Sequence, residues 1–178
     1  MRIKFATILL IAVLSVVLIS GCIGNDNNDS KKYIVKDNVK YTFYKPLDEV
    51  KDVEIQDKQK ILSLLYNTEK ITFVSNESSP DSGKYAVAVI GIKEKLQNYF
   101  AQSGKLVKFN AADMNNENLS YVDNPIVLIQ GPNEGAEENL VKHVRNNVIL
   151  IKGKDYDGLK LVSDGLSYLV ITARVVEQ

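Results

Sequence analysis

Cysteine and histidine are almost missing from this sequence: its 178 residues include only Cys22 and His143 of these types, and no tryptophan. A lone cysteine cannot form an intrachain disulfide, so core packing must stabilise the fold. Iron–sulfur clusters and cysteine-based zinc sites are excluded for the same reason. Because one histidine without a Gly-x-Ser-x-Gly motif indicates neither a catalytic triad nor a histidine-rich metal site, we expect His143 to be a boundary residue of a helix. We predict no metal and no cofactor.

An excess of charge of one sign is also missing, since 22 basic residues balance 22 acidic ones. A nucleic-acid-binding domain usually carries a basic patch, and a membrane-surface protein often carries a polybasic segment. We therefore predict no nucleic-acid partner. Apolar residues make up 45% of the chain, which is enough to bury a substantial core.

The N-terminal segment is the passage with the most specific chemistry. An uncharged, mostly apolar run over residues 5–20 follows Arg2 and Lys4. At about 1.5 Å per residue this run spans roughly 24 Å as a helix, which is less than the ~30 Å of bilayer hydrocarbon. Its length favours a cleaved signal peptide over a transmembrane anchor.

The run ends in Ile19-Ser20-Gly21-Cys22, which is typical of the lipobox of an exported lipoprotein. Cleavage between Gly21 and Cys22 would leave the cysteine as the first residue, with its thiol carrying the lipid. An uncleaved anchor and plain secretion remain alternatives. We expect a signal peptide over residues 1–21 and a protein attached to the outer side of the cell membrane through Cys22.

Residues 22–32 are predicted to be the lipidated N-terminus and a flexible tether, because residues 24–32 offer no apolar side chain to bury. Residues 33–178 have the usual length of one domain. β-Branched and aromatic residues around Asp37-Asn38 predict a β-hairpin over residues 33–45. Asp57 is expected to cap a helix that runs through residues 61–65.

From residue 70 onward, short apolar runs alternate with amphipathic segments, as in a parallel sheet whose two faces are covered by helices. The predicted strands are residues 71–74, 85–90, 106–109, 126–129, 148–151 and 168–176, and the predicted helices are residues 92–103, 134–146 and 156–166. A weak strand-glycine-helix-strand repetition starts near residues 88 and 127. We predict a three-layer α/β fold with a mostly parallel central sheet, helices on both faces and an N-terminal β-hairpin.

Ligands of such sheets bind at the carboxyl ends of the strands, so the loops there are the candidate sites. They supply the candidate residues Gly131, Asn133, Gly153, Asp155 and Asp157. The loop at residues 131–135 could cradle an anion, but its acidic helix start favours a structural turn. The loop at residues 152–158 could bind calcium, but its flanking lysines favour a helix cap. A third loop, residues 75–83, is predicted to be solvated.

Two of these loops carry a resemblance. Ile-Val-Leu-Ile-Gln-Gly-Pro-Asn at residues 126–133 and Ile-Leu-Ile-Lys-Gly-Lys-Asp-Tyr at residues 149–156 resemble the strand-Gly-Gly-Pro-x-Asn and Gly-x-Asp-Tyr pattern of α/β domains in archaeal surface-layer proteins and small archaeal lipoproteins. More distantly, they are similar to bacterial cell-wall-binding repeats. The chain has Gln130 in place of the first glycine of the pattern. The resemblance implies association with surface-layer or cell-wall components.

Two classes of function follow. The first is a non-catalytic, membrane-anchored surface lipoprotein that binds or organises envelope components. The second is an exported enzyme or small-solute-binding protein with a site at the carboxyl ends of the strands, which would require a deep pocket there. The missing nucleophile and metal motifs favour the first class.

Overall fold

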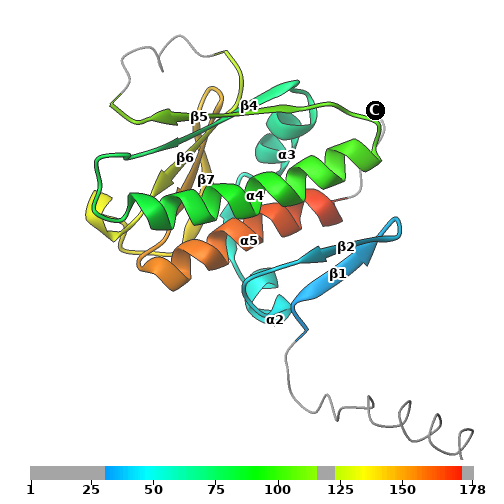
Figure 1. The fold of residues 1–178 in the computed structure, drawn as a ribbon, viewed down its shortest axis with the longest axis horizontal. Helices are drawn as coiled ribbons and strands as arrows, with labels where there is room; N and C mark the ends of the chain where they lie inside the picture. Colours follow the sequence, from blue (N-terminus) through cyan, green and yellow to red (C-terminus); the bar gives the residue numbers. More distant parts are fainter. Residues whose placement is uncertain (1–30, 116–122, 174–178) are drawn as a thin grey trace, which may run out of the picture. The chain divides into compact units, whose positions relative to one another are not determined.

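A six-stranded mixed sheet in the order β3-β7-β8-β6-β4-β5 lies at the centre of the fold (Figure 1). The computed structural model describes residues 31–115 and 123–173. The strands of the sheet are β3 (Glu54–Gln56), β4 (Lys70–Ser75), β5 (Lys108–Asp113), β6 (Ile126–Gln130), β7 (Leu140–Arg145) and β8 (Val148–Lys152). The helices are α2 (Leu47–Lys51), α3 (Lys58–Tyr66), α4 (Ser82–Gln102) and α5 (Tyr156–Thr172), with a short 3₁₀ turn, η2, at Pro132–Glu134.

The α/β class, the mostly parallel sheet and the N-terminal hairpin are confirmed. Neighbouring strands are parallel throughout the sheet except where β7 pairs with β8. Those two strands are antiparallel because only Asn146 and Asn147 connect them, and so short a connection cannot carry the chain back to start a parallel strand. The predicted strands at residues 71–74, 126–129 and 148–151 lie in β4, β6 and β8, and β5 begins at Lys108 within the predicted 106–109 strand.

The hairpin forms a separate two-stranded sheet of β1 (Tyr33–Lys36) and β2 (Val39–Thr42). Asp37 and Asn38 have φ angles of 52° and 63°, in the left-handed region. A two-residue turn with positive φ at both positions matches the twist of antiparallel strands, and Asn and Asp tolerate that conformation better than most residues.

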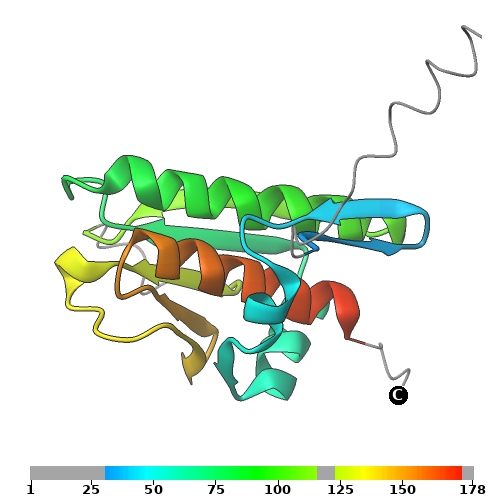
Figure 2. The same ribbon diagram turned by 90° about the horizontal axis from the view of Figure 1, so that it is seen from below.

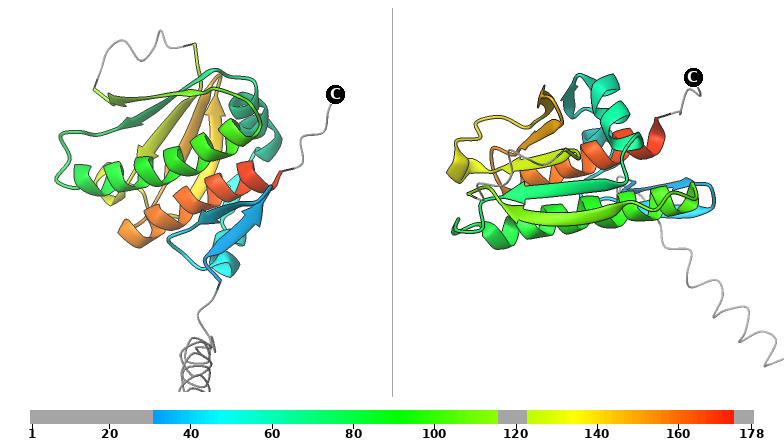
Figure 3. Two further views of the ribbon diagram at one scale, coloured as in Figure 1. Left: turned by 45° about the vertical axis from the view of Figure 1, so that its right-hand side comes forward. Right: turned by 90° about the horizontal axis from the view of Figure 1, so that it is seen from above.

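The helices pack on one face of the sheet. Helix α4 lies along α5, and α5 contacts α2, α3, β7 and β8 (Figures 2 and 3). The sheet contributes alternate residues to the core that they share, among them Ile71, Phe73, Val127, Ile129, Ile149 and Ile151, each at most 1% exposed. Because side chains alternate between faces along a strand, these residues define the helix-covered face of the sheet.

The expectation of helices on both faces is wrong for the described residues. The chain passes from β4 to its parallel neighbour β5 through α4. Helix α3 packs on the same side as α5, because Tyr66 of α3 donates a hydrogen bond to the Val170 carbonyl of α5 at 2.5 Å. The described residues between β5 and β6, 114–115 and 123–125, contain no helix. The described structure therefore has two layers rather than three.

Three predicted elements have the wrong type. The run at residues 85–90 is not a strand but part of α4, whose buried residues Tyr85, Ala88, Ile92 and Leu96 follow the spacing of one helix face. The predicted repetition is therefore wrong as well. A short apolar run does not distinguish a buried strand from a buried helix, and here the helix period of the longer segment decides.

The other two errors lie near the C-terminus. The predicted helix at residues 134–146 consists of η2, a loop and β7, because Val141 and its neighbours pair with β8. The predicted strand at residues 168–176 is a continuation of α5 as far as Thr172, and residues 174–176 lie outside the described residues. The helix predicted after Asp57 is present as α3, but Asp57 has a φ of 56° and its side chain makes no capping hydrogen bond.

A buried ion pair joins the end of the hairpin segment to the helix layer. Lys95 of α4 lies 3.2 Å from Asp164 of α5, which is 0% exposed. The backbone amides of Tyr44 and Lys45 donate to the other oxygen of Asp164 at 2.6 and 2.9 Å. Burial raises the pKa of Asp164, while Lys95 and the two amides act in the opposite direction. These bonds hold the segment after β2 against α4 and α5.

Candidate ligand-binding sites

The predicted carboxyl-edge loops meet at one end of the sheet. Asn76, just after β4, donates to Glu134 at 3.2 Å, and Asn133 donates to Asp81 at 2.6 Å. Gly153 donates its amide to the Gln130 carbonyl at 3.0 Å. The loop at residues 75–83 is therefore not fully solvated, and its Ser79 is only 6% exposed.

At Gly131 the chain's own carboxylate takes the place of an external anion. Glu134 accepts the Gly131 amide at 3.0 Å and also accepts a hydrogen bond from the Tyr85 hydroxyl. A Cβ on Gly131 would lie 2.6 Å from the Tyr85 ring, so only glycine allows this approach. Burial, with the bond to Glu134, raises the pKa of Tyr85 to about 12. A neutral tyrosine with so high a pKa is a structural donor and a poor general base.

At the Gly153 loop the carboxylates are also occupied. Asp155 caps α5 by accepting the Gly158 amide at 2.6 Å. Asp157 lies 3.3 Å from Lys45 and 3.8 Å from Lys160. No group of three or more His, Cys, Asp and Glu side chains suited to a metal ion occurs within residues 31–115 and 123–173.

Little space remains between these loops. The cavity there has a volume of about 30 Å³, and its lining residues are Asp81, Lys84, Tyr85, Pro132, Asp155, Tyr156 and Leu159. That volume is close to the space that one water occupies in the liquid. Gly131, Asn133, Gly153, Asp155 and Asp157 thus lie around a contact between loops that has no room for a substrate.

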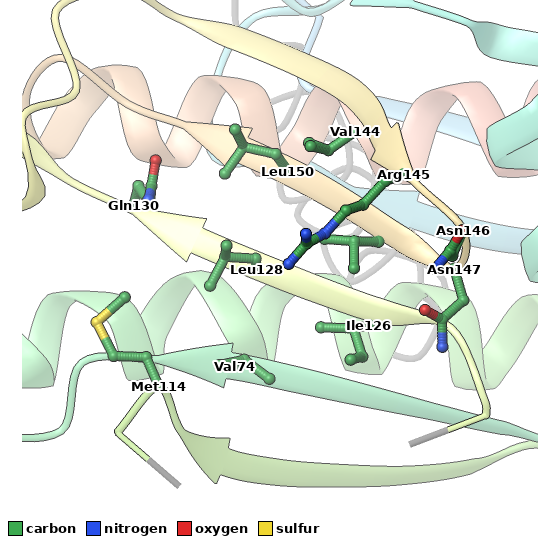
Figure 4. Close-up of a pocket in the computed structure, with 11 residues that line it drawn as sticks. Val74, Met114, Ile126, Leu128, Gln130, Val144, Arg145, Asn146, Asn147 and Leu150 are labelled. Carbon is green, nitrogen blue, oxygen red and sulfur yellow. The ribbon is translucent and has the colours of Figure 1, made fainter. Parts of the chain in front are cut away.

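A much larger cavity lies on the face of the sheet opposite the helices (Figure 4). Its volume is about 770 Å³, within the range of small-molecule sites. The lining is mainly apolar and consists of Val74, Met114, Ile126, Leu128, Gln130, Val144, Arg145, Asn146, Asn147, Val148 and Leu150. We refer to this set as the sheet-face cavity.

A β-bulge in β7 turns Arg145 toward the sheet-face cavity. His143 pairs with Ile149, whereas Arg145, two residues later, pairs with Val148, only one residue before Ile149. Val144 is thus an extra residue, and Val144 and Arg145 both line the cavity although they are consecutive. Without the bulge Arg145 would lie on the opposite side of the strand, because side chains alternate.

The guanidinium of Arg145 extends over the apolar floor toward Leu128 (Figure 4). Among the lining residues that the structure describes, it is the only charged group. Across the described ranges 31–115 and 123–173, Arg145 makes no salt bridge; Lys45, Lys84, Lys95, Lys152 and Lys160 each have an acidic partner. In its described part, the cavity therefore combines an apolar floor with one cation and no acidic residue.

The sequence analysis missed this cavity for two reasons. Leu128 and Leu150 belong to runs that are apolar on both faces, which predicted helices on both sides. The bulge has no local sequence signature, and residues 134–146 were expected to be helical. Asn146-Asn147 was the available signal, because such a pair is compatible with a tight turn between strands. Asn146 has a φ of 47°.

The remaining predicted residues fall in two places. His143 lies on β7, not on a helix, and its Nε2 lies 3.0 Å from the Asn146 carbonyl oxygen. Gly21 and Cys22, with the predicted signal peptide and most of the tether, lie outside the described residues. Among the helices that the structure describes, none is long and apolar enough to cross a bilayer.

Comparisons with protein-family models, with curated proteins and with solved structures gave no match. The proposed function therefore rests on the sheet-face cavity and on the sequence around Cys22.

Proposed function

We propose that this protein is a membrane-anchored surface lipoprotein whose α/β unit is a non-catalytic binding module of the cell envelope. Ile19-Ser20-Gly21-Cys22, after a short apolar run, supports lipid attachment at Cys22 on the outer side of the membrane. The partners proposed for the module are surface-layer or cell-wall components.

The sheet-face cavity is the observation that carries the binding role. It offers about 770 Å³ and an apolar floor, while the described cavity between the loops at the carboxyl edge offers about 30 Å³. An enzyme or solute receptor of the second class would need its pocket at that edge. Glu134 and Asp155 occupy the edge with bonds inside the chain.

Metabolic labelling with a lipid precursor tests the anchor. Wild-type protein is expected to carry the label and to sediment with membranes, whereas Cys22→Ser is expected to lose the label. Ser20→Ala keeps a small residue before the cleavage site and serves as the matched control, which should be labelled like wild type. Equal labelling of wild type and Cys22→Ser would overturn the proposed anchor.

Sedimentation with isolated envelope material tests the binding role. Membrane vesicles that contain the wild-type lipoprotein are mixed with purified surface-layer sheets or wall polymer, and bound vesicles are measured after density separation. Leu128→Asp places a charge in the sheet-face cavity and should reduce binding, while Lys93→Gln on the exposed side of α4 should not. Binding no greater than that of vesicles without the protein would contradict the proposal.

A further inference from the structure

The floor of the sheet-face cavity is recessed although no described helix covers it. Val74 is 1% exposed, and Ile126 and Leu150 are each 8% exposed. A partner can contact these recessed side chains only through a group that enters the cavity. The floor therefore suits a small molecule that enters the cavity, and its apolar lining requires that most of this molecule be apolar.

The polar part of the ligand is indicated by Arg145. A guanidinium presents a fork of donors that matches the two oxygens of a carboxylate or a related oxyanion. Among the described residues that line the cavity, none is acidic and could pair with Arg145. Gln130 and Asn146 add amide groups to the lining, which can bond to a polar head group without opposing its charge.

The bulge makes this arrangement specific. Because Val144 is inserted between His143 and Arg145, one short stretch of β7 supplies both an apolar contact and the cation to the same cavity. Bulges that re-aim a side chain are common next to functional sites. A regular strand would leave an apolar cavity that lacked a charged group.

We propose that the sheet-face cavity binds a free amphipathic anion, of the fatty-acid carboxylate class. The apolar chain lies on the floor between Leu128 and Leu150, and the carboxylate accepts hydrogen bonds from the Arg145 guanidinium. This inference goes beyond the proposed function, on which it rests only for the binding role of the sheet-face cavity, by assigning a small amphipathic ligand to that cavity.

Photolabelling of the full chain in its own membranes tests the proposal. The probe is dodecanoate with a diazirine on its alkyl chain, and peptide mass spectrometry locates the label. Wild type is expected to carry the label within residues 126–152, and unlabelled dodecanoate is expected to remove it. Dodecyltrimethylammonium, which has the same tail and the opposite charge, should compete poorly.

Variants at Arg145 distinguish recognition of the anionic head group from non-specific hydrophobic binding of the probe. Arg145→Gln should weaken labelling by about tenfold or more, because a hydrogen bond to a charged group is lost. Arg145→Lys keeps the positive charge but not the forked guanidinium, so its labelling should lie between that of wild type and that of Arg145→Gln. Lys93→Gln removes an exposed cation from α4 and should label like wild type. Because all variants are compared in the same membranes, partition of the probe into lipid is common to all of them.

Two results would overturn the proposal. The first is equal labelling of wild type and Arg145→Gln with equal competition by the cationic probe. The second is labelling confined to other parts of the chain. Circular dichroism of Arg145→Gln shows that the variant is folded, so that a reduction in labelling cannot be ascribed to loss of structure. Failure of lipid attachment at Cys22 with retained photolabelling would contradict the proposed location and leave this ligand class standing.

Discussion

The two faces of the six-stranded sheet carry the same kinds of apolar side chain but have different surroundings. Ile129 and Ile151 pack under α4 and α5 and are fully buried, whereas their strand neighbours Leu128 and Leu150 line the sheet-face cavity. The apolar side chains of the helix-covered face are buried against helices of the same chain. The described lining of the cavity face retains apolar surface and one cation. Apolar side chains of similar type thus stabilise the fold on one face of the sheet, and on the other face we propose that they bind a ligand.

The largest effect is expected on the helix side, at the buried ion pair. Lys95→Met leaves Asp164 buried without its cation and should destabilise the fold by about 3–5 kcal/mol. Because burial already raises the pKa of Asp164, the variant favours the neutral acid, and its loss of stability should grow as the pH rises above the ordinary aspartate pKa.

Urea unfolding at several pH values between acidic and neutral measures this loss. Lys93→Met, on the exposed side of the same helix, is the matched control and should change stability little. A Lys95→Met variant as stable as wild type at neutral pH would mean that Asp164 does not depend on the pair.

Adjacent residues of β6 compare the two faces directly. Ile129→Ala removes a fully buried side chain from the helix-covered face and should cost about 2–5 kcal/mol. Leu128→Ala acts on a partly exposed residue of the cavity and should cost about 1 kcal/mol. Chemical denaturation of the two variants checks the order, and a larger loss for Leu128→Ala would show that the cavity face is packed as tightly as the other.

A smaller effect is expected at the filled carboxyl edge. Tyr85 has its pKa raised to about 12, so its neutral form is favoured in the folded state. Its contribution is fully present below pH ~10, the ordinary tyrosine pKa, and is lost as the pH rises toward 12. Between pH 8 and 11, wild type should therefore lose about 1 kcal/mol more stability than Tyr85→Phe. If the stability of the two proteins depended on pH in the same way, the neutral Tyr85 hydroxyl would not stabilise the loops at the carboxyl edge.

The smallest effect on stability is expected at Arg145. This exposed side chain has no salt bridge within residues 31–115 and 123–173, so Arg145→Gln should change stability by less than about 0.5 kcal/mol. Thermal unfolding measures the change. A marked loss would indicate that Arg145 stabilises the β7–β8 hairpin, and its loss of ligand binding would then have a structural explanation.

The sequence predicted the parts of the fold that depend on local chemistry. Asp37-Asn38 specifies the hairpin turn, and Asp155 caps α5 as its position indicates. The strands at residues 126–129 and 148–151 follow from β-branched and leucine runs. Each of these features requires only neighbours along the chain.

The errors occur where distant contacts decide. The apolar run at residues 85–90 is compatible with a strand or a helix, and the packing of α4 against α5 favours the helix. Residues 140–145 become a strand because they pair with β8. The bulge at Val144 and the position of Arg145 depend on the register of that pair, so the sheet-face cavity could not be predicted from the sequence.

The difference between the two faces can be tested most directly by nuclear magnetic resonance with methyl-labelled protein and dodecanoate. We expect intermolecular contacts from the dodecanoate chain to the methyl groups of Leu128, Val148 and Leu150, and none to Ile129, Ile149 or Ile151. Contacts to the second group, or no contacts to the first at saturating dodecanoate, would contradict a binding site on the cavity face of the sheet.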